Sequence, residues 1–365
     1  MQLIWIAAGF TLANPTEDQA EGLRRLLAQD SPHIITVASG SMGTGKTSTV
    51  INLAAALARG GKDVLIIDEN AGATNLAGTL GLSAHRDLLD VIRRDKALDE
   101  VIISGPDGIR LLPAGRGMPV LGKLGSHDQT HLIDCFGDFA QPTDVVLIDA
   151  APGRASRMLS LTLSDHEIVV VVSPEPASIT AAYALIKHIS GDCGVQRFRV
   201  LVNRVGMEAE AQLIFDNMAG VAHRYLAVSL DFMGFIPPDD KLRQSNRRGR
   251  SVIEMFPDAI SAAAFRHAAE SLDHWPRSED ESNANNESNE SKSKGLGGFM
   301  QCLIQSSQNQ RQRAGNNGGQ SGSIRQGASN SKSPARHDDH SSPIRQINRN
   351  DTVGKNPKGP MVRHV

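Results

Sequence analysis

Residues 40–47 read Gly40-Ser-Met-Gly-Thr-Gly-Lys-Thr47 and match the pattern G-x-x-x-x-G-K-[ST]. Glycines at these places allow successive backbone N–H groups to close around phosphate oxygens. The apolar run 33–39 before the loop predicts a buried strand, and residues 46–59 predict a helix whose positive N-terminal end faces the same anion. A glycine-rich turn that binds nothing is the alternative. We predict a nucleotide site whose binding residues here are Gly40, Gly43, Thr44, Gly45, Lys46, Thr47 and Ser48.

A second apolar run, residues 144–149, ends in Asp149 and leads into Ala-Ala-Pro-Gly. The Asp149 carboxylate and the Thr47 hydroxyl are suited to a Mg²⁺ ion, while Lys46 reaches the β- and γ-phosphates. Because any buried strand can end in Asp, this run is informative only in combination with the loop at residues 40–47. The two segments together predict ATP and Mg²⁺ as cofactors.

Short apolar runs alternate with helical patterns between residues 33 and 274. Their Val, Ile and Leu content indicates burial on both faces, which is typical of strands in a parallel sheet. The predicted strands are 33–39, 63–68, 144–149, 167–173 and 198–203, and the predicted helices are 46–59, 127–138, 155–164, 178–190 and 207–224. This alternation predicts an α/β fold with a mostly parallel sheet flanked by helices.

The totals for all 365 residues fit a protein that folds in water. Hydrophobic residues make up 40% and charged residues 21% of the chain. The formal net charge is -2, so the whole protein has no positive electrostatic field that would favour binding of nucleic acid. The three cysteines have no Cys-x-x-Cys spacing, which indicates a reducing compartment and no zinc site. The chain is therefore expected in the cytoplasm.

Composition divides the chain into six parts. We predict a disordered extension at 1–15, a lone helix at 16–30, the nucleotide-binding domain at 31–275 and an acidic linker at 276–294. An amphipathic segment follows at 295–305, and a basic tail rich in Gln, Asn, Ser and Gly occupies 306–365. The linker and the tail lack the apolar residues needed to form a core.

The segment 295–305 carries one apolar stripe at helical spacing, formed by Leu296, Phe299, Met300, Leu303 and Ile304. Because Gly297 and Gly298 weaken so short a helix, we expect it to fold only on a surface. Reversible binding to an anionic membrane is the preferred interpretation, and docking on the protein's own core is the alternative.

Several further segments, in this order along the chain, resemble the MinD/ParA family of P-loop ATPases. Residues 65–82, LIIDENAGATNLAGTLGL, are similar to the first switch, and DAAPG (149–153) to the second. The resemblance implies that Asp68 contributes to the metal site and that Lys46, Asp68 and Asn70 form the catalytic set. The segments VLVNRV (200–205) and MGFIPPDD (233–240) resemble the parts beside the base, which implies nucleotide-binding roles for Asn203, Arg204 and Pro237.

Two features resemble the FlhG (FleN) branch of that family. One is the Pro-Glu-Pro segment within residues 172–187, and the other is a D-Q-A-x-x-L-R element formed by Asp18, Gln19, Ala20, Leu23 and Arg24. The resemblance implies a regulator of flagellar number and placement whose first helix stimulates FlhF, a GTPase. It also implies flagellar basal-body or transcription-regulator partners, an ATP-dependent homodimer and reversible association with the inner membrane, without specific binding to nucleic acid.

Two positions depart from the family pattern. The signature lysine, which acts on the nucleotide of the opposite subunit, is replaced by Ser41. A cation that one subunit supplies to the nucleotide of another raises the rate of hydrolysis by roughly 10³–10⁵-fold. The second Asp of the first switch, which positions the attacking water, is replaced by Asn70, and the neighbouring Glu69 should point to the other side of the strand end. We expect slow hydrolysis, unless another residue compensates.

Other function classes remain open. A ParA-type DNA-partitioning ATPase would use the basic tail for salt-dependent binding. A scaffold that kept the fold and lost catalysis would bind no ATP. An electron-transfer relative of the nitrogenase iron protein is disfavoured by the spacing of Cys135 and Cys193.

Overall fold

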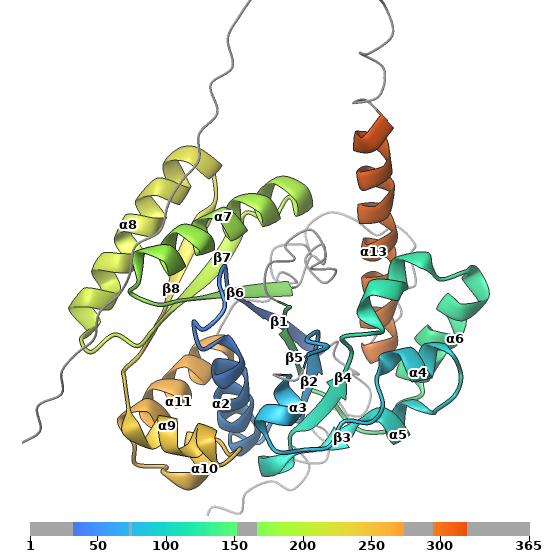
Figure 1. The fold of residues 1–365 in the computed structure, drawn as a ribbon, viewed down its shortest axis with the longest axis horizontal. Coiled ribbons are helices and arrows are strands. Elements are labelled where there is room, and N and C mark those ends of the chain that lie inside the picture. The colour runs from blue at the N-terminus through green and yellow to red at the C-terminus, as the bar shows by residue number, and fades with distance from the viewer. Residues whose placement is uncertain (1–31, 73–74, 152–165, 274–294, 320–365) are drawn as a thin grey trace, which may run out of the picture. The chain divides into compact units, whose positions relative to one another are not determined.

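The computed structural model describes residues 32–72, 75–151, 166–273 and 295–319 (Figure 1). The predicted extension 1–15, the helix at 16–30 with its D-Q-A-x-x-L-R element, the helix at 155–164 and the linker at 276–294 lie outside these residues or end at their border. So does the predicted tail from residue 320 onward.

A single sheet organises the described chain, with strand order β3-β4-β2-β5-β1-β6-β7-β8. Its strands are β1 His33–Ala38, β2 Val64–Asp68, β3 Ile103–Ser104, β4 Arg110–Pro113, β5 Val145–Asp149, β6 His166–Val172, β7 Arg197–Asn203 and β8 Ser229–Ile236. Every pairing is parallel except that of the short β3 with β4. The predicted α/β fold is confirmed, and β3, β4 and β8 are additions to the five predicted strands.

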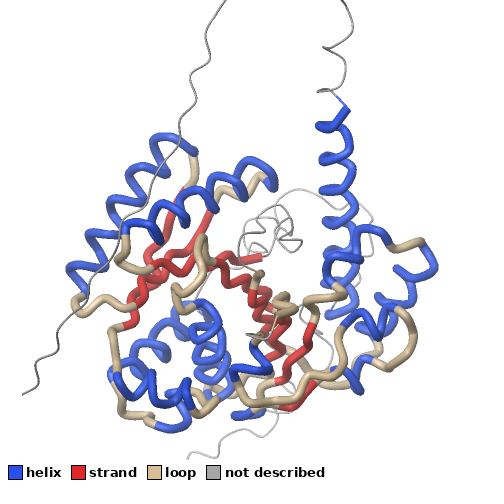
Figure 2. Tube along the Cα trace, in the orientation of Figure 1, coloured by secondary structure: helices blue, strands red, loops and turns tan. Residues whose placement is uncertain are grey.

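Helices cover both faces of this sheet (Figure 2). They are α2 Lys46–Arg59, α3 Leu76–Thr79, α4 Leu88–Ile92, α5 Leu98–Val101, α6 Ser126–Gly137, α7 Pro176–Cys193, α8 Glu208–Leu226, α9 Asp240–Arg247, α10 Val252–Met255, α11 Ile260–Asp273 and α13 Gly295–Gly319, with 3₁₀ turns η1 Pro106–Gly108 and η2 Met118–Lys123. On one face, α2, α10 and α11 share a core with the sheet. On the other, α4, α6 and α13 cover one half and α7 and α8 the other half.

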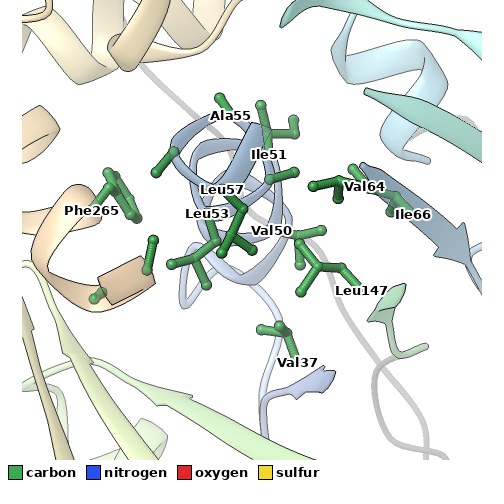
Figure 3. Packing of buried hydrophobic residues seen from close by; sticks show 14 of the residues in the cluster. Val37, Val50, Ile51, Leu53, Ala55, Leu57, Val64, Ile66, Leu147 and Phe265 are labelled. Atoms are coloured by element: carbon green, nitrogen blue, oxygen red, sulfur yellow. The ribbon is translucent and has the colours of Figure 1, made fainter. Parts of the chain in front are cut away.

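The helix α2 is buried along almost its whole length, which explains its Ala- and Leu-rich sequence. Figure 3 shows Leu53 and Leu57 of this helix among Val37 and Leu147 of the sheet and Phe265 of α11. Each fully buried large side chain contributes roughly 1.5–3 kcal/mol. Because α2 starts directly after the loop at residues 40–47, this packing fixes the loop against the sheet.

The helix α13 differs from its prediction in two ways. It continues to Gly319, so the expectation of a disordered tail from residue 306 is wrong for 306–319. Its apolar stripe is also buried in the chain's own core, beside Leu132 and Phe136 of α6. The exposed fractions of the stripe are Leu296 8%, Phe299 4%, Met300 0%, Leu303 0% and Ile304 1%. The alternative interpretation, docking on the protein's own core, is therefore the arrangement that the structure shows, and binding to a membrane stays a prediction.

Two close contacts seat α13. A Cβ added to Gly297 would lie 3.1 Å from the Cα of Gly137, at the end of α6. A Cβ added to Gly122 in η2 would lie 2.8 Å from the carbonyl oxygen of Ser307. The glycines thus let backbones approach where larger residues would hold them apart. Within the described ranges, no helix combines the length and apolarity needed to cross a bilayer.

Candidate nucleotide-binding site

The candidate site lies at the carboxyl ends of the central strands. After β1 the chain adds β2 to β5 on one side of this strand and then crosses to add β6 to β8 on its other side. In open parallel sheets, ligands bind outside the carboxyl ends of the strands at such a reversal. The register places Asp149 beside both Val37 and Asp68, so three strand ends deliver their residues to one place.

The loop between β1 and α2 is held in shape by its glycines. Gly45 has φ 92°, and a Cβ there would also lie 2.3 Å from Nδ2 of Asn203. Gly40 packs so closely on α7 that a Cβ would lie 2.1 Å from the backbone carbon of Ala181. Because neither position tolerates a side chain, Gly40 and Gly45 have structural reasons to be glycine in addition to the predicted phosphate contact.

Lys46 and Thr47 both meet Asp149. Lys46 is 7% exposed, and its Nζ forms an ion pair with Oδ1 of Asp149. The Thr47 hydroxyl donates to Oδ2 of the same carboxylate at 3.0 Å. The predicted arrangement of Lys46, Thr47 and Asp149 is thus assembled. A triphosphate and its cation would exchange these bonds for their own, with Lys46 turning to phosphate.

Asp68 and Asn70 complete the acidic side of the site. Asp68 accepts hydrogen bonds from the backbone of Leu76, at 2.6 Å, and of Asn70, at 2.9 Å. The Asn70 amide donates to Oδ1 of Asp68 at 2.7 Å and to Oδ2 of Asp149 at 3.1 Å. Burial, and then the charge of Asp149, raise the pKa of Asp68 to about 6. Two carboxylates held this close favour a divalent cation between them and a bound phosphate.

Glu69 also belongs to this site, which sequence reasoning missed. Its side chain is 9% exposed, and its Oε2 accepts a hydrogen bond from the backbone of Ala151 at 3.1 Å. Burial raises the pKa of Glu69 to about 7, against the opposing effects of that hydrogen bond and of Lys46. The expectation that Glu69 points away is wrong. A second acidic residue between Asp68 and Asn70 was the available signal.

The residues predicted to lie beside the base meet at the ends of β7 and β8. Asn203 is paired in register with Ile236, and the Arg204 backbone donates to the Ile236 carbonyl at 2.7 Å, so Pro237 follows directly beside them. Nδ2 of Asn203 donates to the Thr44 carbonyl at 2.7 Å. Asn203 therefore supports the loop at residues 40–47, and its predicted contact with adenine stays a prediction.

Of the remaining loop residues, Ser41 and Ser48 form hydrogen bonds that support the loop, and Gly43 faces open space. The Ser41 carbonyl accepts from the hydroxyls of Ser39, at 3.1 Å, and Thr44, at 3.4 Å. The Ser48 hydroxyl exchanges hydrogen bonds with the side chain of Asn246, at 3.2 and 2.9 Å. Gly43 has φ 80° with open space where a Cβ would lie. Asn246 is a supporting residue that no sequence pattern indicated.

The donor set suits magnesium held partly by its nucleotide. In the described parts of the chain, no three His, Cys, Asp or Glu side chains are grouped to hold a metal on their own. Mg²⁺ is commonly bound through one or two carboxylates together with substrate phosphates. Thr47, Asp68 and Asp149 would supply that share, and the burial of the two carboxylates fits a cation that balances their negative charge.

Several known proteins are similar in sequence to this chain. The CobQ/CobB/MinD/ParA nucleotide binding domain matches residues 35–252. Antiactivator FleN of Pseudomonas aeruginosa is 37% identical over 243 residues, which cover 67% of this chain and 87% of FleN. Flagellum site-determining protein YlxH of Helicobacter pylori is 25% identical over 237 residues, or 64% of this chain and 80% of YlxH.

A solved structure shows the same fold. The septum site-determining protein MinD of Pyrococcus horikoshii, complexed with Mg-ADP, superposes with a TM-score of 0.52 and 24% identity. The match covers 67% of this chain and 96% of that one.

Proposed function

Since the chain belongs to the MinD/ParA family of P-loop nucleotide-binding proteins, in its FlhG/FleN branch, we propose that it is an ATP-binding regulator of flagellar number and placement. ATP and Mg²⁺ would bias it between two states, and partners would respond to the state. The flagellar part of the proposal is supported by the names of FleN and YlxH.

One observation carries the nucleotide proposal. At the start of α2, directly behind a glycine loop, the buried Lys46 and the half-buried Thr47 both bind the buried carboxylate of Asp149 at the end of β5. Lys46 is positioned to exchange the Asp149 carboxylate for phosphate oxygens, and the freed carboxylate and the Thr47 hydroxyl are suited to Mg²⁺. Burial of a lysine ammonium costs free energy, and a glycine-rich turn that binds no ligand would gain nothing from it.

Calorimetric titration with Mg-ATP tests this proposal. We expect wild type to bind, Lys46→Ala to lose binding, and the matched control Lys62→Ala, a lysine in the turn after α2, to bind as wild type does. Absence of binding by the wild-type chain would reject the nucleotide switch and promote the catalytically inactive scaffold.

Hydrolysis is proposed to be slow. Ser41 has no cationic group to offer to a second subunit, and the Asn70 amide is occupied by the carboxylates of Asp68 and Asp149. Without the trans lysine, an ATP-dependent homodimer would need other contacts. Met42, next to Ser41, is 82% exposed and so is available for one.

Membrane association is proposed to need release of α13. The five side chains of its apolar stripe are buried, so a lipid surface could bind them only after the helix leaves α6 and η2. The protein would then be cytoplasmic with α13 docked and associated with the inner membrane with α13 free. Sedimentation with anionic liposomes, with and without Mg-ATP, tests this step, and identical soluble fractions in all conditions would contradict it.

A flagellar GTPase of the FlhF kind is the proposed partner of residues 14–30. The support is the D-Q-A-E-G-L-R sequence at 18–24. We expect a peptide of residues 14–30 to accelerate the GTPase and a peptide with Gln19→Ala and Leu23→Ala to have no effect. Equal rates with both peptides would exclude this partner role, while basal-body or transcription-regulator partners would remain to be tested by the same logic.

A further inference from the structure

The outer face of α8 exposes an apolar stripe. In the described part of the chain six large hydrophobic side chains are exposed, and four of them belong to α8 or to its N-cap residue. Their exposed fractions are Met207 66%, Leu213 61%, Val221 43% and Tyr225 68%. Single exposed hydrophobic residues are common on protein surfaces, but a group of them on one helix indicates a surface that binds a partner.

This stripe lies on the side of α8 that faces away from the sheet. Figure 1 shows α8 beside β8, the strand at one edge of the sheet. The inner side of the helix packs in the core through Ala211, Met218 and Ala222. Leu213 and Val221 are eight residues apart, slightly more than two turns, so they share the outer face, and Asn217 lies midway between them.

The charges on the same face are separated along the helix. Glu210 lies in the first turn and Arg224 in the last, and both are exposed. Each is seven residues from Asn217, in opposite directions. Turning one copy of α8 end for end about Asn217 therefore brings Glu210 of one copy to the level of Arg224 of the other. The same turn brings Leu213 to the level of Val221, so the face is complementary to itself, as an interface with twofold symmetry requires.

Gly220 lies on this face as well. A glycine inside a helix lowers its stability, and a Cβ added at Gly220 would meet nothing within 4 Å. No contact within the described residues therefore requires a glycine here. A second helix that crosses this face could approach the backbone more closely at Gly220 than at a residue with a side chain.

We infer that this face of α8 binds α8 of a second copy of the chain, paired antiparallel about Asn217. Leu213 and Val221 form the apolar centre, and Glu210 and Arg224 form two symmetric ion pairs at its ends. The interface goes beyond the proposed nucleotide switch, because its residues are not those of the nucleotide site and it needs no ATP. One helix face is smaller than the roughly 1,600 Å² of a standard interface, so we expect a weak dimer.

Sedimentation velocity of the full chain without nucleotide tests the interface by charge reversal. With rising concentration we expect wild type to shift from the mass of one chain toward that of two. Glu210→Arg alone and Arg224→Glu alone each place like charges opposite each other at both ends, and each should weaken the dimer by about tenfold. The double variant Glu210→Arg/Arg224→Glu brings opposite charges together again and should restore it. Because the two positions are about 21 Å apart along one helix, this rescue cannot arise within a single copy.

Two further variants complete the test. Leu213→Gln removes part of the apolar centre at an exposed position and should weaken the dimer without unfolding the chain. Arg93→Glu reverses the charge of an exposed arginine at the end of α4, on the other half of the sheet, and should behave as wild type does.

The outcomes separate this inference from the proposed function. A wild-type chain that stays monomeric without nucleotide would overturn the inference even if Mg-ATP produced a dimer, since that dimer would belong to the proposed switch. A dimer indifferent to both single reversals would place the contact elsewhere. Weakening by the single reversals without rescue by the double variant would exclude the antiparallel pairing and assign the stripe to a helix of a different protein. None of these results changes ATP binding, and a chain that binds no Mg-ATP could still dimerise through α8.

Discussion

Gly122 offers a way to loosen α13 without touching the helix itself. In η2, a Cβ on this residue would lie 2.8 Å from the carbonyl oxygen of Ser307, 3.2 Å from its carbonyl carbon and 3.3 Å from its Cβ. Real Cβ atoms do not approach a backbone oxygen so closely, so Gly122→Ala must push α13 away. Overpacking of this kind costs about 1–3 kcal/mol, which is about a 5- to 150-fold shift toward the released helix.

Hydrogen–deuterium exchange of the peptide covering residues 296–309 measures that shift. We expect its amides to exchange faster in Gly122→Ala by about the same factor, while amides of β1 and β5 keep their rates. Binding to anionic liposomes should increase in parallel, because the apolar stripe is unchanged and more often free. The control is Gly191→Ala in α7, a helix with no described contact to α13, where an added Cβ meets nothing within 4 Å.

Two results would count against this reasoning. Unchanged exchange in Gly122→Ala would mean that the contact with Ser307 does not hold the helix. Faster exchange without any gain in liposome binding would keep the docking contact but remove the membrane role of the stripe.

Three further predictions concern the nucleotide site. The double variant Ser41→Lys/Asn70→Asp should raise the ATPase rate, since it restores the trans cation and a carboxylate; an unaltered rate at ordinary family levels would refute slow hydrolysis. Asp149→Ala leaves the buried Lys46 ammonium unpaired, so chemical denaturation without nucleotide should show a loss of about 3–5 kcal/mol, and a change near zero would contradict the buried ion pair. The raised pKa of Glu69, about 7 against an ordinary 4.5, means that the folded chain keeps a proton that the unfolded chain has released. That contribution to stability is complete below about pH 4 and lost by about pH 7, on the order of 3 kcal/mol, so the melting temperature of Glu69→Gln should fall less over this range than that of wild type.

The sequence alone was sufficient to predict the residues at the centre of the site. These residues are either consecutive in the chain or lie at the ends of adjacent strands. The pattern at residues 40–47 includes Lys46 and Thr47, and a buried run ending in Asp149 implies a strand end beside them. Parallel pairing then brings Asp68 to the same edge without any further information. These steps use only the period of strands and the chemistry of glycine loops.

Glu69 was missed because strand alternation was extended one residue too far. Alternation predicts opposite directions for neighbouring side chains, but β2 ends at Asp68. Beyond the last strand residue, hydrogen bonds decide direction, and the Ala151 N–H draws the carboxylate toward the loop after β5. The consecutive acidic residues Asp68 and Glu69 were a signal that the sequence offered, but no pattern predicts the Ala151 N–H as the partner, and that contact could only come from the structure.

The glycines of α13 are a second case in which the sequence alone gives the wrong expectation, here about the stability of a helix. By intrinsic propensity each glycine in a helix costs about 1 kcal/mol, which argues against a stable helix at residues 295–305. At Gly297 the missing side chain lets the helix approach the backbone of Gly137, and that close packing offsets the cost. The same apolar stripe cannot contact α6 and a bilayer at once, so the proposed membrane association requires that whatever loosens the docked helix strengthens lipid binding, and that binding to lipid frees the surface of α6 and η2 for other contacts.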